Sequence, residues 1–342
     1  MERYPLRYSG RRRRRSRKWA YIVSVLLVLL AMKIFIRGSN PTSVVGDVDE
    51  FSVFTNSIQT ENSEVLTAPR PISELNLDEI PISLSESNPE LTAVIDDVMA
   101  CIDAEPPRII AARNKLNQML SMPMSRQQLA FVKKQLSKLS EQWLFSRTVF
   151  PEDTLCGSYK VKLADQFIKL GKRFKVPYEI LMRINKISDA KALRAGDTIK
   201  VINGPFHCKI YRSAFTMDLY LQDTFIRSFS VGLGKPGTET PTGCWAVKPN
   251  GKLISPTWTD PTTGKTYEAE NPNYPLGARW IGLEGIKGAA KDRTGFAIHG
   301  TKKTDEIGTA GSQGCIRLYN DDVILLYDLL MPGVSQVIVV KP

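Results

Sequence analysis

Histidine is scarce in this sequence, and the paired ligand spacing of a metal site is missing. The 342 residues include only two histidines, His207 and His299, and five cysteines that stand singly. Structural zinc sites are built from Cys and His ligands that usually come in closely spaced pairs. The scattered ligands therefore predict no metal site.

The sequence also lacks a convincing nucleotide-binding motif. Residues 232–237 read GLGKPG and match G-x-G-x-x-G after an expected strand. A dinucleotide site needs a helix that begins directly after the glycines, because the helix N-terminus binds the pyrophosphate. Pro236 and Pro241 flank a polar turn here, so no helix can start in register. We interpret the motif as a hairpin loop and expect no cofactor.

Positive charge and hydrophobicity are both concentrated near the N-terminus. The net charge is +11, and residues 1–18 hold nine Arg or Lys against one acid. Residues 19–36 are apolar apart from Ser24 and Lys33, and about 18 such residues are just enough to cross a bilayer. Basic residues stay on the cytoplasmic side of a membrane span. The pattern predicts a single-pass signal anchor with a cytoplasmic tail, and with everything after it in the periplasm or cell wall.

Two alternatives to this anchor are weaker. A basic tail can bind nucleic acid, but membrane topology explains the charge without such a partner. A cleaved signal peptide would need a small-x-small cleavage site, and none follows the apolar run. In an oxidising compartment, five cysteines also leave at least one thiol unpaired. Cys101–Cys156 and Cys208–Cys244 are conceivable disulfides, but connectivity cannot be read from a sequence.

Two segments between the apolar run and the first small domain carry no chemical motif. Residues 37–88 are polar and acidic with few aromatics, which predicts a disordered linker whose ends lie roughly 40 Å apart. Residues 89–155 have helical periodicity, and Ser125 is the expected N-cap of one helix. The apolar stripe of that helix is formed by Leu129, Val132, Leu136, Leu139 and Trp143. We interpret residues 89–155 as a helical spacer.

Residues 158–203 are expected to form a strand, two helices and a second strand. The segment resembles the LysM module, a small βααβ domain that binds glycans containing N-acetylglucosamine. The matching positions are Tyr159, Val161, Phe174, Val176, Leu181, Asn185, Leu193, Gly196, Asp197, Ile199 and Val201. The sequence departs from many LysM modules in the first loop, where Leu163-Ala164-Asp165 replaces Gly-Asp.

The remaining residues, 206–341, alternate like short strands punctuated by Gly and Pro, and residues 320–330 predict one helix with Asn320 as its N-cap. His299 ends one expected strand, and Cys315 begins another sixteen residues later. A thiol needs a base to become a nucleophile, and imidazole is the usual one. His207 beside Cys208 is the other candidate base, and a buried, inert Cys315 is the ordinary alternative.

The residues around His299 and Cys315 also resemble a known family. His299-Gly300 followed by Ser312-Gln313-Gly314-Cys315-Ile316-Arg317 is similar to the signature of the L,D-transpeptidase catalytic domain, the YkuD family. Residues 240–243, TPTG, and residues 273–280, NYPLGARW, resemble two further motifs of that family in the same order. The resemblance covers residues 206–341. It implies a multidomain protein whose C-terminal domain is mostly β.

The resemblance implies a role for each site residue and requires no metal. Its catalytic residues would be Cys315 as nucleophile, His299 as proton donor and acceptor, Gly300 as the carbonyl that orients His299, and Gly314 with the amide of Cys315 as oxyanion hole. Its substrate-binding residues would be Ser312, Gln313, Arg317 and Trp280. One departure is that Gln313 stands where the family has a second histidine. Glutamine forms hydrogen bonds but takes up no proton near neutral pH.

The resemblance implies an enzyme of cell wall biogenesis whose partners are peptidoglycan stem peptides and glycan strands. Cys315 would attack the carbonyl of the third stem residue and release the terminal D-Ala. The side-chain amine of another stem would then resolve the acyl-enzyme and form a 3→3 cross-link. If water is the acceptor, the activity is that of an L,D-carboxypeptidase or endopeptidase. A non-catalytic peptidoglycan-binding protein is the third reading. The sequence does not choose the acceptor.

Overall fold

The computed structural model describes residues 89–260 and 263–340, with the side chains from Leu91 onward. The described residues all fall within one compact unit. The predicted basic tail, apolar span and linker, residues 1–18, 19–36 and 37–88, lie outside the described residues. No helix within the described part is long and apolar enough to cross a membrane.

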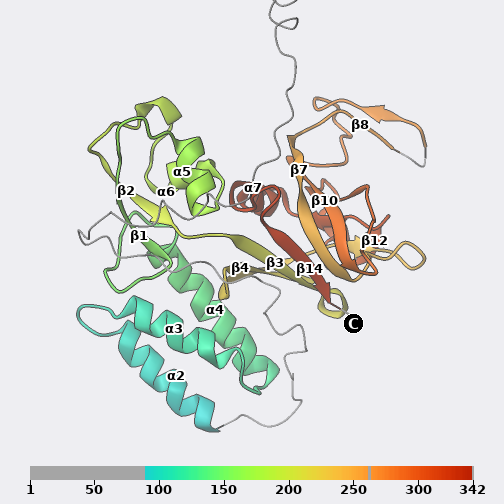
Figure 1. Ribbon diagram of the computed structural model, residues 1–342. Coiled ribbons are helices and arrows are strands. Elements are labelled where there is room, and N and C mark those ends of the chain that lie inside the picture. The colour runs from blue at the N-terminus through green and yellow to red at the C-terminus, as the bar shows by residue number, and fades with distance from the viewer. Residues whose placement is uncertain (1–88, 261–262, 341–342) are drawn as a thin grey trace, which may run out of the picture. The chain divides into compact units, whose positions relative to one another are not determined.

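Three helices form the first described segment: α2 Pro89–Ile102, α3 Ile109–Met119 and α4 Arg126–Trp143 (Figure 1). Ser125 begins α4 with a complete capping box, in which its hydroxyl accepts from the Gln128 N–H and the Gln128 side chain accepts from the Ser125 N–H. This confirms the predicted N-cap. The apolar stripe of α4 faces inward because its members recur every three or four residues. Val132, Leu136, Leu139 and Trp143 are all buried.

The next segment is the expected βααβ unit. Its elements are β1 Cys156–Lys160, α5 Phe167–Phe174, α6 Tyr178–Ile184, the 3-10 turn η2 Ala190–Ala192 and β2 Thr198–Ile202. The two strands pair antiparallel, with Tyr159 opposite Ile199. The buried side chain of Asn185 donates to the Leu181 and Lys200 carbonyls and accepts from the Lys200 N–H. Asn185 therefore joins α6 to β2.

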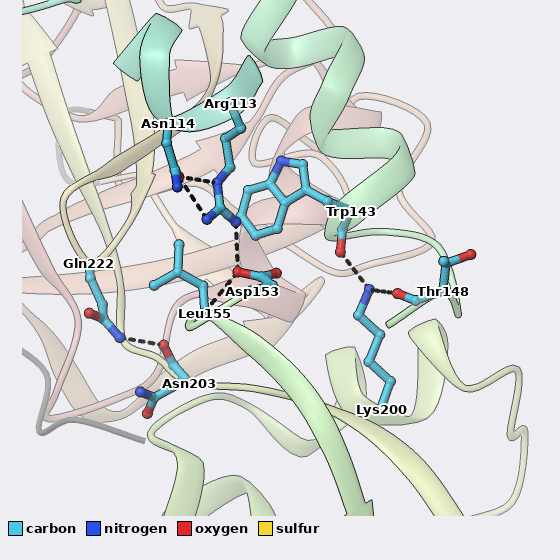
Figure 2. A network of polar contacts seen from close by, with 9 residues as sticks. All are labelled: Arg113, Asn114, Trp143, Thr148, Asp153, Leu155, Lys200, Asn203 and Gln222. Atoms are coloured by element: carbon cyan, nitrogen blue, oxygen red, sulfur yellow. Dashed lines mark hydrogen bonds and ion pairs between the residues drawn. The ribbon is translucent and has the colours of Figure 1, made fainter. Parts of the chain in front are cut away.

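A buried polar network connects this unit to the helices (Figure 2). The Lys200 ammonium donates to the carbonyls of Trp143, Ser146 and Thr148 at 2.5–3.0 Å, which places a cation at the C-terminal end of α4. Nearby, Arg113 forms a buried ion pair with Asp153 at 2.8 Å. Buried charges are tolerated only when paired and hydrogen-bonded. The network therefore fixes β2 against the end of α4.

The C-terminal segment is built on one eight-stranded sheet of order β13-β11-β10-β7-β14-β3-β4-β5. The strands are β3 Phe206–Tyr211, β4 Thr216–Leu221, β5 Thr224–Ser230, β7 Gly243–Ile254, β10 Arg279–Gly288, β11 Phe296–Gly300, β13 Ile316–Leu318 and β14 Gln336–Val340. Neighbours pair antiparallel except β14 with β3 and β11 with β13, which are parallel. The helix α7 Asn320–Leu329 packs against β10 and β11.

Short elements complete this segment. Two small sheets pair β6 Leu233–Gly234 with β12 Ala310–Ser312, and β8 Trp258–Thr259 with β9 Thr266–Tyr267. Two 3-10 turns are η3 Arg212–Ala214 and η4 Thr304–Glu306. The mostly-β architecture predicted for this region is confirmed. The predicted N-cap of α7 is wrong, because the helix begins at Asn320 and Tyr319 occupies the cap position.

The helical segment contacts the sheet as well as preceding it. Helix α4 packs against the edge strand β5. Lys133 of α4 donates to the fully buried carboxylate of Asp218 on β4 at 2.6 Å, and Ser228 donates to the same carboxylate at 2.6 Å. An edge strand has unpaired backbone groups that must be covered or charged. Residues 89–155 thus cover one edge of the sheet and are more than a spacer.

All five cysteines carry free thiols. Cys101, Cys156 and Cys208 are buried, whereas Cys244 and Cys315 are half-buried. Neither of the two conceivable disulfides is formed.

Candidate active site

Strand register brings the predicted site residues to one face of the sheet. His299 on β11 lies opposite Arg317 on β13 and opposite Trp280 on β10. Successive side chains of a strand point to opposite faces, so Cys315, two residues before Arg317, shares the face of His299. The alternate residues Ile298, Ile316 and Leu318 are fully buried in the core. Cys315 lies directly before β13, and its thiol interacts with the backbone of Ala297 on β11, two residues before His299.

The hydrogen bond of His299 defines which ring nitrogen is basic. Its Nδ1 lies 2.6 Å from the Gly300 carbonyl oxygen, and its ring stacks on Trp280 with centroids 5.6 Å apart. A carbonyl can only accept, so Nδ1 carries the proton in the neutral ring and Nε2 keeps the lone pair. Burial lowers the pKa of His299 to about 4; hydrogen bonds with the Gly300 and Leu276 backbones oppose the fall, and the Arg317 charge adds to it. At neutral pH the ring is therefore an uncharged base.

Cys315 is a protonated thiol in its resting state. Burial raises the pKa of Cys315, and a hydrogen bond from the Ala297 backbone only partly opposes the rise. Its Sγ lies 3.9 Å from the Gly295 carbonyl oxygen. With neutral His299 on the same face, the pair is uncharged at rest. A nucleophilic role for Cys315 would therefore require a base that takes up the thiol proton.

The turn before Cys315 is held by side chains that sequence analysis assigned differently or missed. The buried Ser312 hydroxyl donates to the Cys315 carbonyl at 2.6 Å and accepts from the Gly314 N–H at 3.0 Å. Ser312 thus shapes the turn, and its predicted contact with substrate is not supported. The Gly314 N–H already has an acceptor, which removes it from the predicted oxyanion hole in this structure.

Gly314 meets a steric requirement that no other residue meets. Its φ is +113°, and a Cβ there would lie 2.7 Å from the Phe296 ring. Its carbonyl accepts from the Thr240 hydroxyl at 2.9 Å, and that hydroxyl accepts from the Gly234 N–H at 3.1 Å. The Thr240 side chain is fully buried. Thr240 therefore braces the turn of Cys315, and its place in the TPTG motif was the available signal.

The other two predicted substrate-binding residues differ in exposure. Gln313 is exposed at the tip of the turn. Arg317 is half-buried and forms an ion pair with Glu306 of η4. That carboxylate directs the guanidinium toward the loop that follows His299, so Arg317 braces this loop. Glu306 was missed because it belongs to no motif and meets Arg317 only in the folded chain.

His207 lies elsewhere and is not part of this site. It is on β3, and β10, β7 and β14 separate that strand from β11. Its Nδ1 accepts from the Gln336 N–H at 3.1 Å, and burial lowers its pKa to about 4. Across residues 89–260 and 263–340, no three His, Cys, Asp or Glu side chains gather as metal ligands.

Two segments of the chain match known domain families. Residues 206–339 match the family model of the L,D-transpeptidase catalytic domain, YkuD, and residues 159–201 match that of the LysM domain. The chain contains a LysM domain followed by a YkuD catalytic domain. Both domains were expected from their motifs, and the matched ranges agree with the βααβ unit and the large sheet.

Relatives of the chain match between a third and a half of it. It is 29% identical over 183 residues to the candidate L,D-transpeptidase YkuD of Bacillus subtilis (strain 168), covering 52% of this chain and 94% of that protein. It is 35% identical over 128 residues to the probable L,D-transpeptidase ErfK/SrfK of Escherichia coli (strain K12), covering 34% and 38%.

A solved L,D-transpeptidase from Mycobacterium tuberculosis H37Rv is 17% identical, with a TM-score of 0.32. The alignment covers 43% of this chain and 63% of that chain, so it spans less than two thirds of the solved protein.

Proposed function

We propose that this protein is a peptidoglycan L,D-transpeptidase that works through a Cys315 acyl-enzyme. The observation that carries the proposal is the shared face of His299 and Cys315, with Nδ1 of His299 bonded to the Gly300 carbonyl. That bond leaves Nε2 as the basic nitrogen on the side of the ring away from Gly300. The YkuD and LysM domains support peptidoglycan as the partner.

Acylation follows from the uncharged pair. His299 Nε2 accepts the thiol proton as Sγ attacks the carbonyl carbon of the third residue of a donor stem. The resulting oxyanion is assigned to the N–H of Cys315, because the Gly314 N–H is bonded to Ser312. The carbon–nitrogen bond breaks, and the imidazolium returns its proton to the leaving amine of D-Ala. A thioester and neutral His299 remain.

Deacylation reverses these proton movements with a new nucleophile. The side-chain amine of an acceptor stem attacks the thioester, and His299 takes its proton. The carbon–sulfur bond breaks, Cys315 regains the proton, and a 3→3 cross-link is formed. Water in place of the amine would give the carboxypeptidase product. The buried, low-pKa imidazole serves both steps because it is neutral when each attack begins.

The location of the reaction is part of the proposal. The basic residues 1–18 and the apolar residues 19–36 support a single-pass membrane anchor with the catalytic domain in the periplasm or cell wall. The LysM domain would hold glycan strands near the site.

The test uses the full chain in mild detergent, a disaccharide-tetrapeptide substrate and mass spectrometry. We expect loss of D-Ala and a cross-linked dimer, both absent in Cys315→Ala. If D-Ala is lost and only monomeric product is found, the acceptor is water and not the amine. Retained peptidoglycan binding with no Cys315-dependent product would overturn catalysis and favour a binding protein.

A further inference from the structure

Asn320 begins α7, yet its side chain does not cap that helix. Its Oδ1 accepts from the Ala278 N–H at 2.9 Å, and its Nδ2 donates to the Thr301 carbonyl at 3.3 Å. Ala278 directly precedes β10, and Thr301 directly follows β11. One amide group therefore joins the start of the strand that carries Trp280 to the end of the strand that carries His299.

Two glycines make room for this amide. A Cβ at Gly300 would lie 2.2 Å from Asn320 Oδ1, and a Cβ at Gly277 would lie 2.3 Å from the same atom. The Gly277 Cβ would also lie 2.6 Å from the Gly300 carbonyl carbon. Gly277, Gly300 and the Asn320 amide thus pack against one another with no space for a methyl group. The missing Cβ atoms give the Asn320 amide room to bind the segments before β10 and after β11 instead of capping α7.

The backbone held in this way is the one that orients His299. Gly300 supplies the carbonyl that accepts from His299 Nδ1, and the next carbonyl, that of Thr301, accepts from Asn320. We propose that Asn320 is a positioning residue, which fixes the 300–301 backbone so that the Gly300 carbonyl selects the Nδ1–H form of His299. Its catalytic consequence rests on the proposed function, whereas its effect on the ring does not.

The choice of tautomer has a chemical consequence. A neutral imidazole without a partner at Nδ1 prefers to carry its proton on Nε2. If the Gly300 carbonyl moved, His299 would populate that form, and its lone pair would then point at the backbone instead of the reacting atoms. Such a molecule cannot take the Cys315 proton through Nε2. Misplacement by about 1 Å commonly lowers rates by about 100-fold.

The second histidine supplies an internal reference. His207 Nδ1 accepts from a backbone N–H, so its neutral ring must carry the proton on Nε2. Burial gives both rings a pKa of about 4, so both are uncharged at pH 7. The sequence has no third histidine. A spectrum of the histidine rings therefore contains two signals with opposite expected tautomers.

The experiment labels the histidines of the full chain with ¹⁵N and records ring nitrogen–proton correlations at pH 7 in detergent. In the unmodified protein we expect Nδ1–H at His299 and Nε2–H at His207. Asn320→Ala should shift His299 toward Nε2–H and leave His207 unchanged. D-Ala release should fall by about 10- to 100-fold, with less than a threefold change in KM. Asp321→Asn, an exposed change in the same helical turn, should alter neither readout.

Asn320→Asp is the isosteric second variant. It keeps the acceptor for the Ala278 N–H and loses the donor to the Thr301 carbonyl. The His299 tautomer shift should therefore lie between those of the unmodified protein and Asn320→Ala. Unlike Asn320→Ala, this variant leaves no cavity. An unchanged His299 tautomer in a folded Asn320→Asp or Asn320→Ala protein overturns the inference. If the tautomer shifts as expected while the unmodified protein releases no D-Ala, the positioning role stands and the proposed function fails.

Discussion

The two histidines are similarly buried but have different hydrogen bonds at Nδ1. His207 and His299 are 3% and 5% exposed, both lie in the same sheet, and burial lowers the pKa of each to about 4. His207 accepts a backbone N–H through Nδ1, whereas His299 meets a backbone carbonyl there. The comparison shows that burial and a low pKa do not define a catalytic base. The proposed base is distinguished by the direction of its Nδ1 hydrogen bond and by the thiol expected on the same face.

The largest expected difference between the two histidines appears when each is replaced by alanine. His299→Ala should lower D-Ala release by about 10²- to 10⁴-fold, the usual contribution of a general base. His207→Ala should leave the rate within a few-fold and cost about 1–3 kcal/mol of stability, because the Gln336 N–H loses its buried acceptor. Initial rates and urea midpoints of both variants measure this. Equal loss of activity in two folded variants would contradict the assignment of His299 alone.

Two buried hydroxyl groups, Thr240 at the turn of Cys315 and Ser335 beside the partner of His207, can be compared in the same way. Thr240→Val keeps the side-chain shape but removes the hydroxyl between Gly314 and Gly234, so we expect about a 10-fold slower acylation of Cys315. Ser335, which directly precedes Gln336, is the matched control. Its buried hydroxyl accepts a hydrogen bond from the Met331 N–H. Ser335→Ala should lower stability by about 1–3 kcal/mol with no change in acylation. Labelling of Cys315 with a slow thiol reagent, followed by intact mass, separates the two.

Lowering the pH should destabilise the fold by protonating both histidines. It should slow the reaction by protonating His299 alone. Each folded pKa of about 4 lies below the unfolded value of 6.5, so the unfolded chain binds more protons between these values. The free energy of unfolding should therefore fall as the pH drops from 6.5 to 4, by at most about 3 kcal/mol for each ring.

Two pH series measure this difference. His207→Gln should remove about half of the histidine-dependent slope of the urea midpoint. The acid limb of D-Ala release, near pH 4, should stay where it is in that variant. An acid limb that moves with His207 would show that the two rings are not independent.

The smallest expected effect concerns the charge beside His299. Arg317 lowers the pKa of His299, and Glu306 pairs with that guanidinium. Glu306→Gln leaves the positive charge uncompensated, which disfavours the imidazolium further. The acid limb of D-Ala release should move to lower pH by less than about one unit, with Asp305→Asn, an exposed carboxylate in the same turn, as the control. A shift to higher pH would have the wrong sign for this account.

Sequence analysis predicted the parts of the fold and site that depend on local pattern. The N-cap Ser125 and the βααβ unit are each encoded by residue types at fixed spacings, whereas the pairing of His299 with Cys315 stays a prediction. The prediction for Asn320 was wrong for the opposite reason. An Asn at a helix start is a good local cap, but the Ala278 N–H and the Thr301 carbonyl, both far from it in sequence, offer its amide other partners.

The remaining differences also arise from contacts between distant segments. Ser312 looked available to substrate, although the carbonyl and N–H of its own turn occupy its hydroxyl. Glu306 carries no motif, and its meeting with Arg317 depends on a bridge between loops. Residues 89–155 were read as a spacer because periodicity reveals an apolar face but not its partner. The Lys133–Asp218 ion pair, 85 residues apart, identifies that partner.

The attachment of α4 to the sheet has a mechanical consequence. Strands β5 and β13 are the two opposite edges of the eight-stranded sheet, and α4 packs on β5 while His299 and Cys315 lie at β11 and β13. A pulling force that enters the described fold from residues before α2 first loads the helices and then the far edge of the sheet. The strands that hold the thiol and imidazole would be the last to feel that load. The proposed reactive pair therefore lies at the edge of the sheet opposite to the one where such a force would enter.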